Sequence, residues 1–424
     1  MIASIDKAKK TNPQLRKWFL SKQRSDLISP KHETPKEASR RANRFAVSAM
    51  FFMHGLCFAS WAARIPTIKE SIKLSDAGLG SVLFALPMGF FIALPFAGWL
   101  IAKVGSKKGV VSSAVFYSLS LVLIGSSSNV LYLVLSLFSF GFFANILNIS
   151  INTQAVAVEG LYKKRLMATF HGLWSLAGFA GAGIGTWLIG HNVLPLNHFI
   201  FICATFLVVN VVCAFYIVKN DEIASEKRPV FAMPDKSLIK LGFIAFCSMM
   251  AEGAMFDWSG VYFSKVVHVD KQLTGIGYTT FMIAMAGMRF FADKLSGRIG
   301  LKRILQVSGL LTTIGLLLSV IFPEMIPALS GFFLIGMGVS SVVPMVYSAA
   351  GKSKTLSPGT ALTAVSSVGF MGFLIGPPAI GFIAEATSLR ISFLAITIMA
   401  VSVVVLASFL DDEKNQPQKE NLVY

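Results

Sequence analysis

Two acidic side chains lie within a long apolar stretch of this chain, where a charge is costly. Glu252 lies about 14 residues into the stretch 238–264, or about 21 Å along a helix that rises 1.5 Å per residue. A charge at such a depth costs about 2.5–3.5 kcal/mol on membrane-insertion scales and is a functional candidate by default. The sequence predicts that Glu252 exchanges a proton; the alternative is a neutral, hydrogen-bonded structural residue.

Asp257 follows Glu252 by five residues on the same stretch. Five residues turn an ideal helix by about 140°, so both acids can face one space only if the helix is interrupted. Gly253 offers a place for such an interruption, and tight helix packing is its other reading. Asp257 is therefore a second candidate for proton exchange.

Two histidines provide further candidates for proton exchange. His54 shares one helical stripe with Phe58 and Trp61, and His171 shares another with Trp174. Histidine titrates near physiological pH, so either residue could carry a proton. A hydrogen bond to a neighbouring helix is the alternative role for both.

A polar stripe on the stretch 129–156 could bind a neutral solute. Asn145, Asn148 and Asn152 fall within roughly 60° of one another on a helix. Amide groups offer paired donors and acceptors that suit hydroxyls or amides, while hydrogen bonding between helices is the alternative. Three tryptophans are candidate stacking platforms for the same solute, or interfacial anchors: Trp61, Trp174 and Trp258.

The elements that carry these residues are membrane-spanning helices. Of 424 residues, 54% are hydrophobic and only 14% are charged, far outside the range of soluble globular proteins. About 20 apolar residues span a bilayer as a helix. Stretches of that kind are expected at 43–65, 78–102, 109–127, 129–156, 167–190, 197–218, 238–264, 274–295, 303–322, 325–350, 358–385 and 388–410.

The second half repeats the first half's pattern roughly 190 residues later. Gly141-Phe142-Phe143 returns as Gly331-Phe332-Phe333, and His54-Gly55 returns as Glu252-Gly253. The sequence thus predicts an all-α membrane protein of about twelve transmembrane helices in two six-helix pseudo-repeats, an arrangement that carriers use to form a site between two moving halves. The expected parts are a cytoplasmic tail 1–41, a bundle 42–218, a cytoplasmic linker 219–236, a bundle 237–410 and a cytoplasmic tail 411–424.

The positive charges sort to one side of the predicted bundle. Lysines and arginines collect before the first span and in alternate loops, among them 103–108, 163–165, 227–228 and 352–354. Cationic loops stay in the cytoplasm, so both termini are expected there. The net charge of +17 is then an orientation signal and gives no reason to expect a nucleic-acid partner.

The sequence shows no recognisable catalytic, nucleotide-binding or metal-binding motif. The four cysteines fall inside apolar spans without metal-site spacing, and neither a phosphate-binding loop nor a nucleophile elbow occurs in a usable context. We therefore expect no enzyme activity, no cofactor and no metal. Any uphill transport requires an ion gradient or a partner.

These features resemble the major facilitator superfamily of secondary transporters, over residues 42–410. The family's marker between spans 2 and 3 is matched by Gly98, Gly105, Lys107 and Lys108, although Ala102 replaces the marker's aspartate. The echo between spans 8 and 9 retains that aspartate as Asp293. The segments around Glu252, His171 and Gly376 are similar to a poorly characterised bacterial branch near the fucose permeases.

The resemblance implies gating roles for the marker residues. A carboxylate at a cytoplasmic helix end can form ion pairs that exist in only one arrangement of the two halves. Asp293 can do this, and Arg289, four residues earlier, can pair with it on one helix face.

Several readings of the function stay open at this point. The leading one is an alternating-access carrier in the bacterial inner membrane that couples protons to a small polar, possibly sugar-like, solute. An efflux antiporter for drugs or metabolites and a transporter-like sensor without flux are the alternatives. The expected partners are the lipid bilayer, the solute and protons, and the expected state is a monomer.

Overall fold

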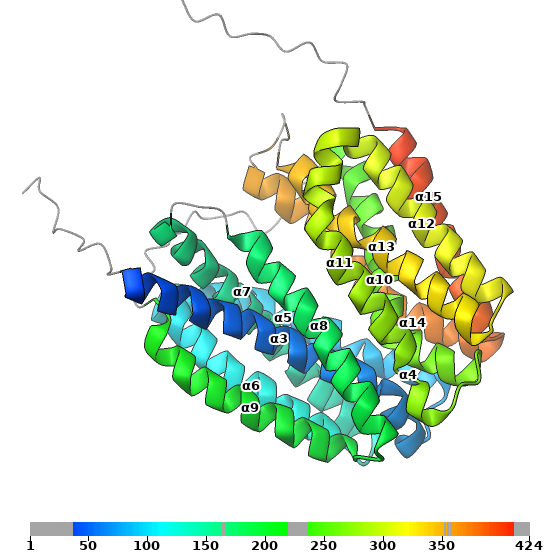
Figure 1. Ribbon diagram of the computed structural model, residues 1–424, viewed down its shortest axis with the longest axis horizontal. Coiled ribbons are helices and arrows are strands. Elements are labelled where there is room, and N and C mark those ends of the chain that lie inside the picture. The colour runs from blue at the N-terminus through cyan, green and yellow to red at the C-terminus, as the bar shows by residue number, and fades with distance from the viewer. Residues whose placement is uncertain are drawn as a thin grey trace, which may run out of the picture. The chain divides into compact units, whose positions relative to one another are not determined.

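The computed structural model describes residues 37–162, 166–218, 236–351, 353, 356 and 358–410. The described residues are helical almost throughout and form no strand. The helices, labelled as in Figure 1, are α3 (Glu37–Ile72), α4 (Asp76–Leu83), α5 (Ala85–Val104), α6 (Ser106–Gly125), α7 (Val130–Tyr162), α8 (Met167–Gly190), α9 (Pro195–Tyr216), α10 (Lys236–Lys265), η1 (Lys271–Leu273), α11 (Ile276–Ile299), α12 (Leu301–Ile321), α13 (Met325–Ala350), α14 (Pro358–Ala386) and α15 (Leu389–Ser408).

These helices confirm the predicted all-α membrane fold. Within the described residues, eleven helical stretches are long and apolar enough to cross a bilayer, and α4 and α5 together make one of them. The twelfth crossing of the predicted pattern is α11, which has 24 residues and carries Arg289 inside it. Residues 219–235 and 411–424 of the predicted linker and C-terminal tail lie outside the described residues.

The chain divides into two units at residue 42, a short N-terminal unit and the body of residues 43–424. Within the body, α6 packs on α7 and α9, and α12 packs on α13 and α15, the same arrangement in each half. Figure 1 shows α6 beside α9 in one half, and α12 beside α15 in the other. Contacts between the halves include those of α4 with α14 and of α8 with α11.

The predicted duplication extends to backbone conformation. Gly105 joins α5 to α6 with φ +83°, and Gly300 joins α11 to α12 with φ +83°. A side chain is disfavoured in this left-handed region, so both turns require glycine. The turn between α5 and α6 therefore explains why the predicted marker has a glycine at residue 105.

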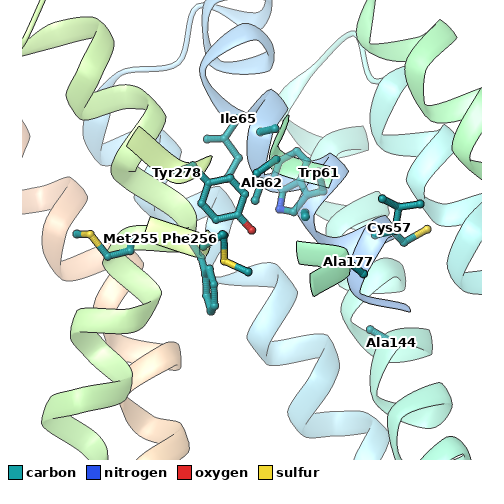
Figure 2. Close-up of a cluster of buried hydrophobic side chains, with 14 of the residues drawn as sticks. Cys57, Trp61, Ala62, Ile65, Ala144, Ala177, Met255, Phe256 and Tyr278 are labelled. Atoms are coloured by element: carbon teal, nitrogen blue, oxygen red, sulfur yellow. The ribbon is translucent and has the colours of Figure 1, made fainter. Parts of the chain in front are cut away.

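The largest buried cluster runs through both halves. Figure 2 shows part of it, with Trp61 of α3, Tyr278 of α11 and Phe256 of α10 among the side chains, and the ring centroids of Phe256 and Tyr278 are 6.2 Å apart. Trp61 and Tyr278 are each only 1% exposed. The four cysteines are buried and free.

Candidate functional site

Glu252 lies near the middle of α10 and is buried, in agreement with its predicted depth. Its Oε1 accepts a hydrogen bond from Nη2 of Arg289 at 3.3 Å. Nη1 of Arg289 in turn donates to Oγ of Ser175 on α8, at 2.6 Å. A carboxylate, a guanidinium and a hydroxyl therefore form one chain between α10 and α11 of the second half and α8 of the first.

Arg289 has a partner that the sequence did not predict. The sequence predicts a pair with Asp293 on its own helix, and this stays a prediction, while the structure joins Arg289 to Glu252 on α10. The side chain of Asp293 lies outside the described residues. Near the middle of α11, Arg289 can pair with a buried carboxylate, and this repays part of the cost of placing either charge inside the membrane.

His54 is buried in the first half and hydrogen-bonded to α8. Its Nδ1 accepts from the indole Nε1 of Trp174 at 3.2 Å, and its ring lies 5.3 Å from that of Tyr117. The hydroxyl of Tyr117 donates to the backbone carbonyl of His54 at 3.3 Å. The tautomer that accepts at Nδ1 carries its proton on Nε2.

The predicted asparagine stripe separates into two parts. Asn145 is almost fully buried and donates to the backbone carbonyl of Phe90 on α5 at 2.6 Å, which is the packing role. Asn152 donates to Oδ1 of Asn148 at 3.1 Å, and its own Oδ1 lies 3.1 Å from Nε2 of His171 on α8. Asn148, Asn152 and His171 are thus brought together as one polar group, while Asn145 has a different partner.

Asp257 and Glu252 lie on one continuous helix. No break occurs at Gly253, whose added Cβ would lie 2.9 Å from a ring carbon of Phe373 on α14, so this glycine serves packing. Asp257 makes no hydrogen bond or ion pair with any described residue. The hydroxyl of Tyr278 on α11 is likewise buried without a hydrogen-bond partner in the described part of the chain.

The three tryptophans differ in their surroundings. Trp61 and Trp258 are fully buried, and the Nε1 atom of each has no hydrogen-bond partner among the described residues. Trp174 is only partly buried, its ring centroid lies 6.1 Å from that of Phe58, and it donates to His54. Of the three tryptophans, only Trp174 is both partly exposed and hydrogen-bonded to a polar side chain, that of His54.

The marker residues lie at the junction of α5 and α6. Nothing lies within 4 Å of a Cβ added at Gly98, and Lys107 and Lys108 follow Gly105 in the first turn of α6. Ala102 offers no carboxylate there. Within the described residues, none of the ion pairs that join the two halves involves this junction.

The halves are joined by charge at the opposite end, which we call the closed end: residues 69–76, 190–195, 265–276 and 385–389. Nζ of Lys265 donates to both carboxylate oxygens of Asp76, at 2.8 and 2.9 Å, and Lys69 lies 2.8 Å from the same carboxylate. Oε2 of Glu385 on α14 accepts from the backbone nitrogen of Asp76 at 2.9 Å and so caps α4 from the other half. A second pair joins Glu70 to Lys271 at 2.9 Å.

Sequence reasoning missed these closed-end residues as a site. The available signal was the mixture of Glu70, Asp76 and Lys69 in one loop with Lys265 and Lys271 in its repeat counterpart, where other loops on this side lack cations. Two surfaces that pair through charge need positive and negative side chains on both, and these two repeat-related loops carry both signs between them.

Asp76→Asn should weaken this closed end. It removes the charge that holds Lys265 and leaves Lys69 without its carboxylate partner, and a loss of about 1.4 kcal/mol corresponds to a tenfold shift toward separated halves. We expect cysteine labelling at the closed end to quicken by about that factor. Glu70→Gln is the matched control: it removes an ion pair whose side chains are 51% and 82% exposed, so it should change labelling little. Equal labelling rates in both variants would contradict the proposal that Asp76 holds the closed end together.

Comparison with known proteins agrees with this fold. The sequence model described as Major Facilitator Superfamily matches residues 47–354 and 241–422. An uncharacterised MFS-type transporter of Yersinia pestis is 31% identical over 84% of this chain and 93% of its own length. Membrane protein MosC of Rhizobium meliloti is 30% identical over 92% of this chain and 99% of its own.

A solved structure of the MFS transporter FucP, in an outward conformation, is similar in fold. It has a TM-score of 0.61 at 18% sequence identity and covers 86% of this chain and 97% of that one. Together, these findings define a multi-pass membrane transporter rather than an enzyme. The chain belongs to the major facilitator superfamily, as the sequence resemblance implies.

Proposed function

We propose that the protein is a proton-coupled carrier that moves a small polar solute by alternating access. The observation that carries this proposal is the chain Glu252–Arg289–Ser175 between the halves, near the middle of α10, α11 and α8. Carriers with repeated halves bind solute and coupling ions near the midplane, at the interface of the repeats. A titratable group that also sets a contact between the halves can link protonation to their movement.

Glu252 is the proposed coupling group. Protonation would remove the charge that Arg289 pairs with, which frees the guanidinium and changes what it can hold on α8. The two arrangements of the halves would then differ in free energy by an amount that depends on proton occupancy, as coupling requires. Asp257, His54 and His171 are the further candidates; His54 and His171 are already hydrogen-bonded to neighbouring helices or side chains.

The proposed solute site comprises Asn148, Asn152 and His171, with Trp174 as an aromatic wall. Amide and imidazole groups offer donors and acceptors to hydroxyls, so a sugar-like solute fits this set. One structural neighbour of similar fold is a fucose:proton symporter by its own description. Its likeness to this chain, at 16% identity, supports a shared fold, and the solute assignment depends on the residues above.

Aromatic contacts between the halves favour a second candidate, an exporter of amphipathic molecules. Phe90 of α5 stacks on Phe370 of α14 with ring centroids 4.8 Å apart, and Phe58 of α3 meets Phe256 of α10 at 5.4 Å. Aromatic surfaces of this kind suit partly apolar ligands. Import and export share the same coupling residues, so the direction of flux separates these candidates.

The proposed orientation places the closed end away from the cytoplasm, because the cationic loops lie at the other end. We propose that this arrangement is inward-facing, in a bacterial inner membrane with both termini in the cytoplasm, because the ion pairs that join the halves lie at the end away from the cationic loops. Reporters fused after Lys108 and near Asn192 should lie on opposite sides of the membrane, the first in the cytoplasm. A shared location would contradict this topology.

The experiment that tests the function is uptake into proteoliposomes that contain the purified full-length protein. Solutes would first be selected by thermal shift among sugars, amino acids, nucleosides and drugs. We expect at least one stabilising solute to accumulate when a pH gradient is imposed and to equilibrate without one. Binding without any flux would instead favour the sensor, and flux that ignores the pH gradient would exclude proton coupling.

A further inference from the structure

The guanidinium of Arg289 is only partly paired within the protein. Its ion pair with Glu252 is a single contact of 3.3 Å from Nη2, longer than the spacing of about 2.7–2.9 Å that is usual for such charged hydrogen bonds. Nη1 donates to Ser175, while Nε is buried and has no hydrogen-bond partner among the described residues. A buried guanidinium is favourable only when its donors are well paired, so Arg289 has the capacity for a better-placed acceptor.

The unpaired donor lies on the same edge of the guanidinium as the donor to Glu252. Nε–H and one N–H of Nη2 point in parallel from this edge, and together they can hold both oxygens of one carboxylate. Glu252 contacts the edge through Oε1 alone. A carboxylate from a solute can contact it through both oxygens, in the space that the side chain of Glu252 leaves when it is protonated and moves away.

The hydrogen-bonded chain continues from Arg289 to the proposed solute site. Oγ of Ser175 donates to the backbone carbonyl of His171, one turn earlier on α8, at 3.2 Å. Nε2 of His171 lies 3.1 Å from Oδ1 of Asn152, which contacts Asn148 in turn. These contacts place a cation at one end of the chain and amide groups that suit hydroxyls at the other.

The members of this chain are accessible to a solute of limited length. The side chain of Arg289 is 24% exposed, His171 is exposed, and Asn148 and Asn152 are partly exposed. One helical turn of α8 separates the contact with Arg289 from His171, a distance of roughly 5–6 Å. A solute that reaches both ends must therefore be longer than a simple carboxylate such as acetate.

We propose that the solute is a sugar acid, a hydroxylated monocarboxylate whose carboxylate takes the place of Glu252 on Arg289. This inference rests on the proposed function and narrows its solute to one chemical class. When Glu252 takes up a proton, Arg289 exchanges one carboxylate for another and so keeps a negative partner. The hydroxyls of the sugar acid then contact Asn148, Asn152 and His171.

The exchange of carboxylates fixes the charge that moves in one transport cycle. Each anion crosses the membrane with one proton, so no net charge moves. A neutral sugar that crosses with one proton would instead move one positive charge. The effect of a membrane potential on transport therefore separates a sugar acid from a neutral sugar.

The first test is calorimetric binding to the purified full-length protein of four acids: gluconate, galactonate, glucuronate and galacturonate. Each is compared with the neutral compound that has a CH₂OH group in place of the carboxylate: sorbitol, galactitol, glucose and galactose. We expect at least one acid to bind at least about tenfold more tightly than its neutral counterpart, and acetate not to bind at millimolar concentration. Binding of none of the acids, or equal binding of every acid and its counterpart, would overturn the inference.

Three variants test the contact with Arg289. Glu252→Gln should raise the affinity for the acid by about tenfold, because a neutral amide holds a guanidinium less strongly than a carboxylate does. Arg289→Lys keeps a positive charge beside Glu252, so it should fold, but it loses the planar pair of donors and should weaken binding by about tenfold or more. Arg390→Gln is the matched control, since Arg390 donates to the backbone carbonyls of Val320 and Ile321 and should not affect the acid. Unchanged affinity in both Glu252→Gln and Arg289→Lys would show that the carboxylate does not bind Arg289.

The second test is transport into proteoliposomes with an imposed pH gradient, with and without a potassium gradient made permeable by valinomycin. A tenfold potassium gradient would change the accumulation of a neutral solute carried with one proton by about tenfold, whereas the accumulation of the acid should not respond. Proton-driven accumulation that responds by that factor would overturn the sugar-acid inference and leave the proton-coupled carrier standing. If no solute accumulates in response to the pH gradient, the proposed function itself is wrong, and this inference is lost with it.

Discussion

Glu252→Gln is expected to abolish accumulation driven by a pH gradient while solute binding and solute exchange persist. Glutamine has the shape of the protonated acid and keeps an oxygen that can accept from Arg289, but it cannot take up or release a proton. Accumulation in proteoliposomes should fall by at least about tenfold, which is 1.4 kcal/mol of lost coupling. Exchange of labelled for unlabelled solute should stay within a few-fold of the unsubstituted protein.

Ser175→Ala is the matched control for this experiment. It removes the 2.6 Å hydrogen bond at the other end of the Arg289 chain but leaves the ion pair with Glu252 intact. We expect it to change the rate of transport and to retain proton-driven accumulation. If Glu252→Gln accumulates solute normally, Glu252 has no part in coupling and Asp257, His54 or His171 must carry it. If the variant loses all binding, Glu252 is a solute ligand.

The fold was predictable because membrane helices leave a local signal. A stretch of about 20 apolar residues spans a bilayer whatever its neighbours are, so span positions follow from the chain alone. The duplication was readable from its glycines, and Gly105 and Gly300 show why: both require the same positive φ. The break in α10 suggested at Gly253 was not found, because a glycine that permits tight packing and one that permits a break look alike in sequence.

Only those site residues were predictable that stand out by their depth within a single helix. Glu252 could be singled out from its place in an apolar stretch, but its partner could not. Helical periodicity places Arg289 beside Asp293 at four residues' distance, while the ion pair found in the structure joins two helices and residues 37 apart. The same limit applies to the asparagines, which share one face of α7 although Asn145 is held by α5 and Asn152 contacts α8.

Contacts between the halves were even harder to predict from the sequence. Lys265 and Asp76 are 189 residues apart, and Glu385 caps a helix that begins 309 residues earlier. Matching charges in repeat-related loops raise the odds of such pairs, but their identity depends on how the halves meet. The resemblance to the superfamily predicted gating at the marker loop, whereas the closed-end ion pairs lie at the opposite end of the bundle.

Gly80→Val should prevent the closed end from forming and thereby stop transport. Gly80 lies on α4, where an added Cβ would be 2.7 Å from the carbonyl oxygen of Pro377 and 3.0 Å from Cα of Gly381, both backbone atoms of α14. From the other side, a Cβ at Gly381 would lie 2.6 Å from the backbone oxygen of Asp76. Backbone atoms of a packed helix cannot move aside as a flexible side chain can, so the halves must separate to admit the new side chain.

The clash lies between the halves and leaves each bundle's own packing untouched, so the variant should fold and insert normally. Flux should fall by about a hundredfold or more, since a carrier that cannot close one end cannot alternate; a clash of about 3 kcal/mol, at the upper end of overpacking costs, is enough. Spin labels at Glu70 and Lys271, whose side chains are 2.9 Å apart in the closed arrangement, should report a longer distance in Gly80→Val. Gly183→Val is the matched control, because nothing lies within 4 Å of a Cβ at that helical glycine, and it should keep both the short distance and most of the flux. A short label distance with normal flux in Gly80→Val would show that the contact of α4 with α14 does not control the transport cycle.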